Sequence, residues 1–203
     1  MKKVATFGEI LLRLATPNKE RILQAKNFDA DYGGGEYNVA VSLSQFGVPT
    51  KFVTALPSNA VGDSAMFRIK GFGIDSSSIV RQGDRMGLYF LEHGAAMRAS
   101  KVVYDRARSS ISEIKSGDID WEKAFNGVDW FHFTGITPAL SSSAAAVTSE
   151  AASAAKDLGL TVSADMNYRK NLWSPQEAQL IMKPLMKYVD IAIGNEEDAE
   201  KCL

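Results

Sequence analysis

The sequence predicts an α/β fold in which a mostly parallel sheet is flanked by helices and carries a small β lid. Short apolar runs alternate with helical stretches along most of the 203 residues, and this rhythm is typical of parallel sheets that are covered on both faces. The rhythm breaks in two segments, about 10–32 and about 75–106, where short extended pieces follow one another. We expect these segments to form the lid of a single domain.

The apolar patterns place the core elements in order along the chain. Each expected strand is a short apolar run, at residues 3–9, 51–56, 130–133, 160–164 and 189–193. The expected helices show helical spacing or N-capping serines, and they cover residues 38–46, 63–72, 141–158, 174–187 and the stretch from 196. Pro184 lies inside one of them and should kink or shorten it. Extended lid pieces are expected at residues 10–15, 78–81, 87–92 and 101–104.

The composition argues against several classes of function. Lysine and arginine nearly balance aspartate and glutamate, 23 against 24, so the charge favours neither nucleic acid nor a membrane surface as a partner. Glu9 and Arg13 interrupt the apolar N-terminal stretch, which argues against a signal peptide. No run approaches the ~18 apolar residues of a membrane helix. The single cysteine, Cys202, excludes an internal disulfide framework, and we expect a cytoplasmic protein.

Three glycines lead directly into the first expected helix. Gly33, Gly34 and Gly35 precede a helical stretch that begins near Asn38. Glycines in this position let a ligand approach the backbone, where free N–H groups and the helix dipole favour anionic or oxygen-rich partners. An ordinary tight turn would give the same pattern, so the glycines alone leave both interpretations open.

Polar or glycine residues follow four of the expected strands. They are Gly8-Glu9, Thr134-Gly135, the stretch Asp165 to Arg169, and Gly194-Asn195-Glu196. The carboxyl ends of parallel strands meet at one edge of the sheet, so we expect these residues to gather around a shared site.

Two arginines indicate an acidic ligand for this site. Arg106 follows Tyr104-Asp105, and Arg169 follows Tyr168. Arginine binds carboxylates and phosphates through paired hydrogen bonds, so two arginines suit a sugar acid better than a neutral sugar. Either arginine could instead pair with a neighbouring acid at the surface, as Arg106 could with Asp105.

The glycine-rich stretch belongs to a longer pattern. Its Gly-Gly pair, Asn38, Gly47 and Gly62-Asp63 resemble the first signature of the ribokinase/PfkB family of sugar kinases. Further motifs are similar to the 2-keto-3-deoxygluconate kinase branch of that family, namely Gly8-Glu9, Gly87-Leu88-Tyr89, Tyr104-Asp105-Arg106 and Asp165-Met166-Asn167-Tyr168-Arg169.

The resemblance implies a ribokinase-like fold, ATP with Mg²⁺ as cofactors, and phosphoryl transfer to 2-keto-3-deoxygluconate. It assigns the sugar acid to Gly34, Gly35, Tyr89, Tyr104, Arg106 and Arg169, with Asn38 shaping the pocket. The tyrosines lie in strand-like pieces, where aromatic residues also serve as packing.

Asn195-Glu196-Glu197-Asp198 resembles the family's Asn-x-x-Glu motif, which implies that Asn195 and Asp198 serve the magnesium and phosphate end of the nucleotide site. The fourth position is Asp198 instead of glutamate, and its shorter carboxylate would act through water. Acidic residues are also favoured at any helix N-terminus by the helix dipole, so the motif has a structural alternative.

The family's second signature, a Gly-Ala-Gly-Asp-like loop with the catalytic base, does not occur in the sequence, and neither does a G-x-x-x-x-G-K-[ST] phosphate loop. We therefore expect residues 1–203 to be the N-terminal part of one kinase domain, with the base aspartate beyond Leu203. These residues would then contain no catalytic residue, and we expect them to have no kinase activity on their own. Two alternatives remain: another kinase of the family, such as a fructokinase or ribokinase, or a non-catalytic sugar-binding fragment that forms a homo-oligomer through its lid.

Overall fold

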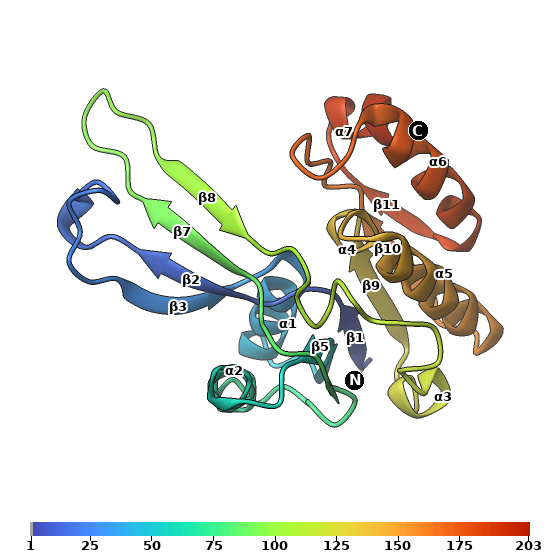
Figure 1. Cartoon of the computed structure of the whole chain (residues 1–203). Helices are drawn as coiled ribbons and strands as arrows, with labels where there is room; N and C mark the ends of the chain where they lie inside the picture. Colours follow the sequence, from blue (N-terminus) through green and yellow to red (C-terminus); the bar gives the residue numbers. More distant parts are fainter. Residues whose placement is uncertain (1) are drawn as a thin grey trace.

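A five-stranded parallel sheet lies at the centre of the computed structural model, which describes residues 2–203 (Figure 1). Its strands, in the spatial order β11-β10-β9-β1-β4, are β11 (Ile191–Ile193), β10 (Thr161–Asp165), β9 (Trp130–Thr134), β1 (Val4–Phe7) and β4 (Thr50–Val53). Every neighbouring pair is parallel, so all five carboxyl ends lie along one edge. The predicted parallel sheet is confirmed.

Helices pack on the sheet around two clusters of buried side chains. Alternate residues of a strand point to opposite faces, and Phe131 and Phe133 of β9 belong to the cluster that includes α5 (Ser142–Asp157) and α6 (Pro175–Leu185). The second cluster contains Phe52 and side chains of α1 (Gly35–Gln45) and α2 (Ala60–Gly71). The last helix is α7 (Glu196–Cys202).

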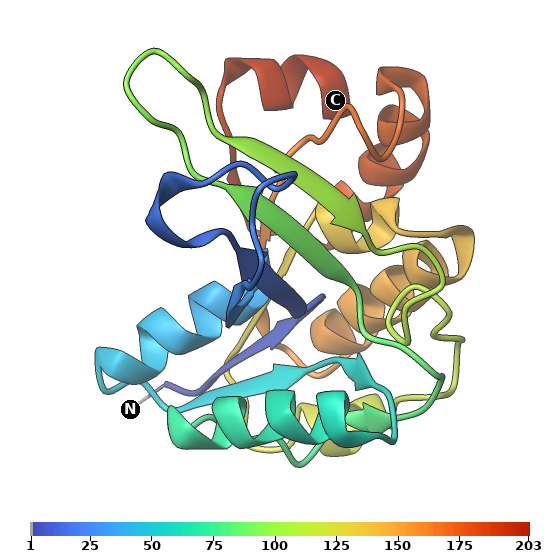
Figure 2. The same ribbon diagram turned by 60° about the vertical axis from the view of Figure 1, so that its left-hand side comes forward.

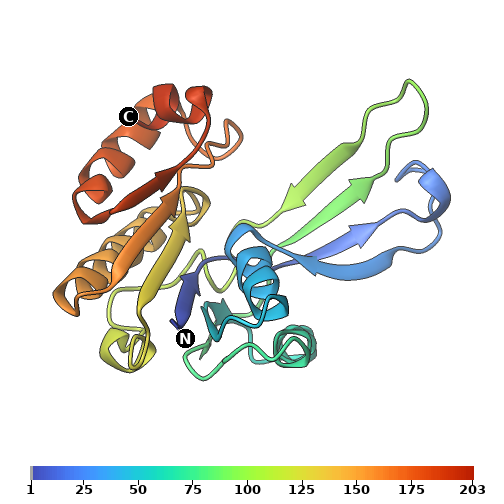
Figure 3. The same ribbon diagram turned by 180° about the vertical axis from the view of Figure 1, so that it is seen from behind.

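The lid is a separate four-stranded sheet of order β3-β2-β7-β8 that projects away from the core (Figures 1 and 3). Its strands are β2 (Leu11–Ala15), β3 (Asp29–Gly33), β7 (Leu88–Glu92) and β8 (Lys101–Asp105). In Figure 2, where this side of the molecule comes forward, the lid lies in front of the core sheet. Its four strands come from the two segments in which the sequence predicted it.

One of the expected lid pieces lies elsewhere. β6 (Val80–Arg81) pairs in parallel with β5 (Ala55–Leu56) and has no partner among the lid strands. The pairing begins with a contact between residues distant in the sequence, since the backbone N–H of Val80 donates to the carbonyl oxygen of Thr54, directly before β5. The lid therefore begins nearer residue 88 than residue 75 on its second segment.

Element ends differ from the expectations in ways that the backbone explains. α1 begins at Gly35, three residues before Asn38, because Gly34 serves as its N-cap. α6 ends at Leu185 and continues as a short 3₁₀ turn (Met186–Tyr188), as expected for a helix with Pro184 in its last turn. Three very short helices were not predicted from the sequence, because three or four residues give no periodic signal: Pro17–Lys19, α3 (Trp121–Ala124) and α4 (Ile136–Ala139).

Among residues 2–203, no helix has the length and apolar character needed to span a membrane.

Candidate active site

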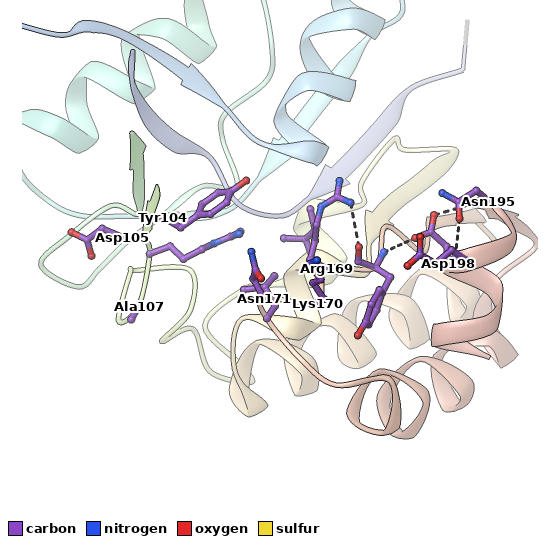
Figure 4. A pocket seen from close by; sticks show the side chains of 13 residues that line it. Tyr104, Asp105, Ala107, Arg169, Lys170, Asn171, Asn195 and Asp198 are labelled. Atoms are coloured by element: carbon purple, nitrogen blue, oxygen red, sulfur yellow. Dashed lines mark hydrogen bonds between the residues drawn. The ribbon is translucent and has the colours of Figure 1, made fainter. Parts of the chain in front are cut away.

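A cavity of about 660 Å³ lies beyond the carboxyl edge of the sheet (Figure 4). One side is formed by the end of lid strand β8 and the residues after it, and the other by the segments that follow β10 and β11. Its volume is typical of small-molecule sites. It is lined by Tyr104, Asp105, Arg106, Ala107, Ile136, Tyr168, Arg169, Lys170, Asn171, Leu172, Asn195, Glu197 and Asp198.

Five of the residues selected from the sequence meet in this cavity, although they come from distant parts of the chain: Tyr104, Arg106, Arg169, Asn195 and Asp198. Four others do not line it. Gly34 and Gly35 lie at the start of α1, Asn38 is exposed one turn further along that helix, and Tyr89 lies within β7. The roles given to all nine remain predictions.

Arg106 pairs with a different acid from the one considered in the sequence. Its Nη2 donates to the carboxylate of the buried Glu9, while Asp105 pairs with Arg85 at 2.8 Å. The guanidinium carbon of Arg106 lies 5.2 Å from the ring centre of Tyr104, a cation–π distance. Arg106 is thus a mostly buried cation that is fixed at the cavity wall.

Arg169 provides a second and more exposed cation in the cavity (Figure 4). Its Nη1 donates to the carbonyl oxygen of Tyr168 at 3.2 Å, and it forms no ion pair with any residue from 2 to 203. Lys170 and Asn171 line the cavity beside it. Sequence reasoning missed these two, although both directly follow the Asp165-to-Arg169 motif.

Tyr89 and Tyr104 lie opposite each other on neighbouring lid strands. Their ring centres are 5.6 Å apart, with the planes tilted by 38°. Tyr89 also packs on the glycine loop, because a Cβ at Gly33 would lie 2.8 Å from its hydroxyl oxygen. Tyr104 lines the cavity directly, whereas Tyr89 does not line it and contacts Tyr104 and Gly33.

Asn195 and Asp198 form a reciprocal cap at the start of α7. The Asp198 backbone N–H donates to Asn195 Oδ1 at 2.8 Å, and the Asn195 N–H donates to Asp198 Oδ2 at 3.2 Å. The other Asp198 oxygen accepts the Tyr168 N–H at 2.9 Å (Figure 4). The structural role considered from the sequence is therefore present, and the carboxylate also joins α7 to the loop after β10.

That loop has an unusual backbone. Asn167 has a φ of 41°, in the left-handed region that asparagine tolerates better than most residues. Its Nδ2 donates to Asp165 Oδ2 at 3.3 Å. Burial, with the nearby negative charge of Asp198, raises the pKa of Asp165. The turn at Asn167 brings Tyr168 and Arg169 to the cavity wall.

A buried carboxyl group lies beneath the glycine loop. Glu36, in the first turn of α1, is fully buried, and its Oε1 accepts from the Thr134 hydroxyl at 2.7 Å and the Thr137 hydroxyl at 2.8 Å. The carboxyl group rests on Gly8, since a Cβ there would lie 2.1 Å from its carboxyl carbon. Burial raises the pKa of Glu36. Sequence reasoning gave Glu36 no role, because only the folded structure shows that it is buried.

Among the described residues, no group of three or more histidine, cysteine, aspartate or glutamate side chains is placed to hold a metal ion. The buried His132 bonds Ser163 through Nδ1 at 2.9 Å, and burial lowers its pKa to about 4, so it is a neutral core residue. Asp198 lines the cavity, and its negative charge is close enough to raise the pKa of Asp165, which does not line the cavity itself. Mg²⁺ is commonly held by one or two carboxylates together with substrate phosphates, and this pair fits that donor set.

Several proteins that share this architecture are named as sugar kinases. The crystal structure of 2-dehydro-3-deoxygluconokinase from Thermotoga maritima matches 99% of this chain and 62% of its own chain, at 52% identity and a TM-score of 0.96. The 2-dehydro-3-deoxygalactonokinase of Haloferax volcanii is 32% identical over an alignment of 203 positions that covers 99% of this chain and 63% of that protein. An uncharacterized sugar kinase from Pyrococcus horikoshii, solved in complex with ATP, shares the fold at 20% identity and a TM-score of 0.79, over 93% of this chain and 62% of its own.

The pfkB family of carbohydrate kinases matches residues 1–203, and the chain belongs to this family. It spans less than two-thirds of the length of these relatives. The family and the ribokinase-like fold that the sequence implied are confirmed.

The buried carboxyl group predicts a pH-dependent stability. With its pKa raised above the ordinary 4.5, folded Glu36 keeps a proton that the unfolded chain releases. The protonated Glu36 carboxyl group makes its full contribution to the free energy of unfolding below pH 4.5. This contribution is lost as the pH rises toward the raised pKa. As the pH rises above 4.5, we expect the urea-unfolding free energy of the wild type to fall relative to Glu36→Gln, by at most about 1.4 kcal/mol per pH unit while the protonation difference lasts.

The matched control is Glu122→Gln, which alters an exposed glutamate on α3 and should keep the wild-type slope. Parallel pH profiles for the wild type and Glu36→Gln would contradict the assignment of a proton to this carboxyl group.

Proposed function

We propose that this chain is the sugar-binding part of an ATP-dependent kinase that phosphorylates 2-keto-3-deoxygluconate, also called 2-dehydro-3-deoxygluconate. The observation that carries the proposal is the pair of arginines, Arg106 and Arg169, on the wall of one cavity. A neutral sugar offers no charged partner for the guanidinium groups, whereas the carboxylate of a sugar acid does. The Thermotoga relative, named for this activity, supports the same substrate class.

Within this proposal, Tyr104, Arg106 and Arg169 contact the sugar acid, and the predicted roles of Gly34, Gly35, Asn38 and Tyr89 concern the loop and lid that surround it. ATP would bind near Asn195 and Asp198, with Mg²⁺ reaching Asp198 through water and contacting the phosphates. The magnesium ion would screen charge on the transferred phosphoryl group. The buried, unpaired Cys202 fits the reducing cytoplasm that we propose as the location.

The first test is the affinity for acid and neutral sugars, measured by calorimetry. We expect 2-keto-3-deoxygluconate to bind at least tenfold more tightly than fructose or ribose. Hydrogen bonds to charged groups contribute about 1.5–3 kcal/mol, so Arg106→Gln and Arg169→Gln should each weaken binding of the acid by roughly 10- to 100-fold. Arg68→Gln is the control, since Arg68 pairs with Asp31 and does not line the cavity. Tighter binding of fructose or ribose would favour the neutral-sugar kinases instead.

The second test concerns phosphoryl transfer. No Gly-Ala-Gly-Asp-like loop occurs in the sequence, so we propose that a polypeptide of these 203 residues alone binds the sugar acid without phosphorylating it. In a coupled assay with ATP and Mg²⁺, release of ADP should not exceed the rate without sugar. Turnover on the scale of ordinary kinases, about 1–100 s⁻¹, would contradict this proposal.

The lid supports a further proposal, that two copies of the chain associate through it. β8 is an edge strand with all five residues exposed, and Val102 and Val103 are each 42% exposed. Unprotected edge strands with apolar side chains favour pairing with another chain. Gel filtration with light scattering should give about twice 22.1 kDa for the wild type and a monomer for Val103→Lys. Phe67→Lys changes an exposed apolar residue on α2 and should stay dimeric; a monomeric wild type would exclude the lid dimer.

A further inference from the structure

The carboxylate of Glu9 lies at the junction between the core sheet and the lid. β1 ends at Phe7 and β2 begins at Leu11, so Glu9 is in the connection that leads from one sheet to the other. Two glycines make room for it. A Cβ at Gly87 would lie 2.8 Å from Glu9 Oε1, and a Cβ at Gly34 would lie 2.0 Å from the Glu9 carbonyl oxygen. The side chain of Glu9 is only 2% exposed, so Glu9 can act only through the few groups that contact it.

The main contact of Glu9 is with Arg106, which is 97 residues later in the sequence. Arg106 Nη2 donates to Glu9 Oε2, and the Ser109 hydroxyl donates to Oε1 at 3.4 Å. Glu9 therefore holds one edge of the guanidinium group, while the Tyr104 ring covers its face. Arginine carries five N–H donors in a rigid fork, so this arrangement leaves donors for a ligand in the cavity that Arg106 lines.

We propose that Glu9 is the positioning residue for Arg106, fixing its guanidinium group so that Glu9 and the carboxylate of the sugar acid share it. This inference rests on the proposed function, because it requires an acidic ligand. Arg106 enters from the end of the lid and Glu9 from the end of the first core strand. The pair therefore sets the position of the lid arginine relative to the core.

The charges around Glu9 give the proposal a second consequence. Burial raises the pKa of Glu9 to about 7, Arg106 opposes the rise, and the neighbouring Glu36 adds to it. A ligand carboxylate on Arg106 would bring another like charge close to Glu9 and raise its pKa further. Binding of the sugar acid at pH 8, where free Glu9 is mostly ionised, should then be accompanied by proton uptake.

The test is calorimetric binding of 2-keto-3-deoxygluconate and of its uncharged C1 amide. Glu9→Gln should weaken binding of the acid about tenfold and change binding of the amide less than twofold. Arg106→Gln should weaken binding of the acid at least as much, and the double variant should bind no worse than Arg106→Gln. Arg106→Lys, which cannot hold Glu9 and the ligand with one planar fork, should also lose affinity for the acid. If Glu9→Gln fails to fold, proton uptake by the wild type still tests the role of Glu9, because it should occur with the acid and not with the amide.

Proton uptake is obtained by repeating the titration at pH 8 in buffers of different ionisation enthalpy. The wild type should take up a fraction of a proton with the acid and none with the amide, and Glu9→Gln should take up none with either. Three results would overturn the role of Glu9 while leaving the proposed function in place. Glu9→Gln could weaken binding of the acid and of the amide equally, it could still weaken binding in the absence of Arg106, or it could take up as many protons as the wild type. A wild type that binds no sugar acid would overturn the proposed function and this inference with it.

Discussion

The arrangement of the candidate site depends on a buried carboxyl group that no cation balances among residues 2–203. Glu36 Oε1 accepts hydrogen bonds from the end of β9, through Thr134, and from α4, through Thr137. Its backbone carbonyl accepts from the Thr6 hydroxyl of β1 at 3.1 Å. One residue in the first turn of α1 thereby ties together the central strands and the glycine loop. Burying such a group is costly unless it is hydrogen-bonded or neutral, which explains the two threonine hydroxyls that donate to Oε1 and the raised pKa.

Close approach of neighbouring atoms, from side chains as well as backbone, explains three of the glycines better than flexibility does. Gly8 lies against the Glu36 carboxyl group, Gly34 against the Glu9 carbonyl oxygen, and Gly87 against the Glu9 side chain. A methyl group at any of these positions would meet an atom within 3 Å. The connections between core and lid can therefore pack side by side only where glycine occurs, and this packing sets the lid over the carboxyl edge of the sheet.

Much of the fold follows from local patterns in the sequence. The five core strands and the main helices are marked by apolar runs and capping residues such as Ser141 and Ser174. The motif residues at the strand ends also indicated the site, and Tyr104, Arg106 and Arg169 do meet in one cavity. β6 was misplaced because two residues of extended chain can pair with either sheet, and the choice depends on the distant β5.

What the sequence could not provide is the set of partners across long separations. Arg106 has Asp105 as its neighbour in sequence, yet its guanidinium pairs with Glu9, and Asp105 pairs with Arg85. This difference in the partner of Arg106 matters for function. A surface pair with Asp105 would leave Arg106 hydrated and mobile, whereas a buried pair with Glu9 removes that freedom before a ligand arrives. When the arginine is already oriented, ligand binding costs less side-chain conformational entropy, so more of the interaction free energy contributes to affinity. The same cation is therefore better suited to recognise a carboxylate than its sequence context alone suggests.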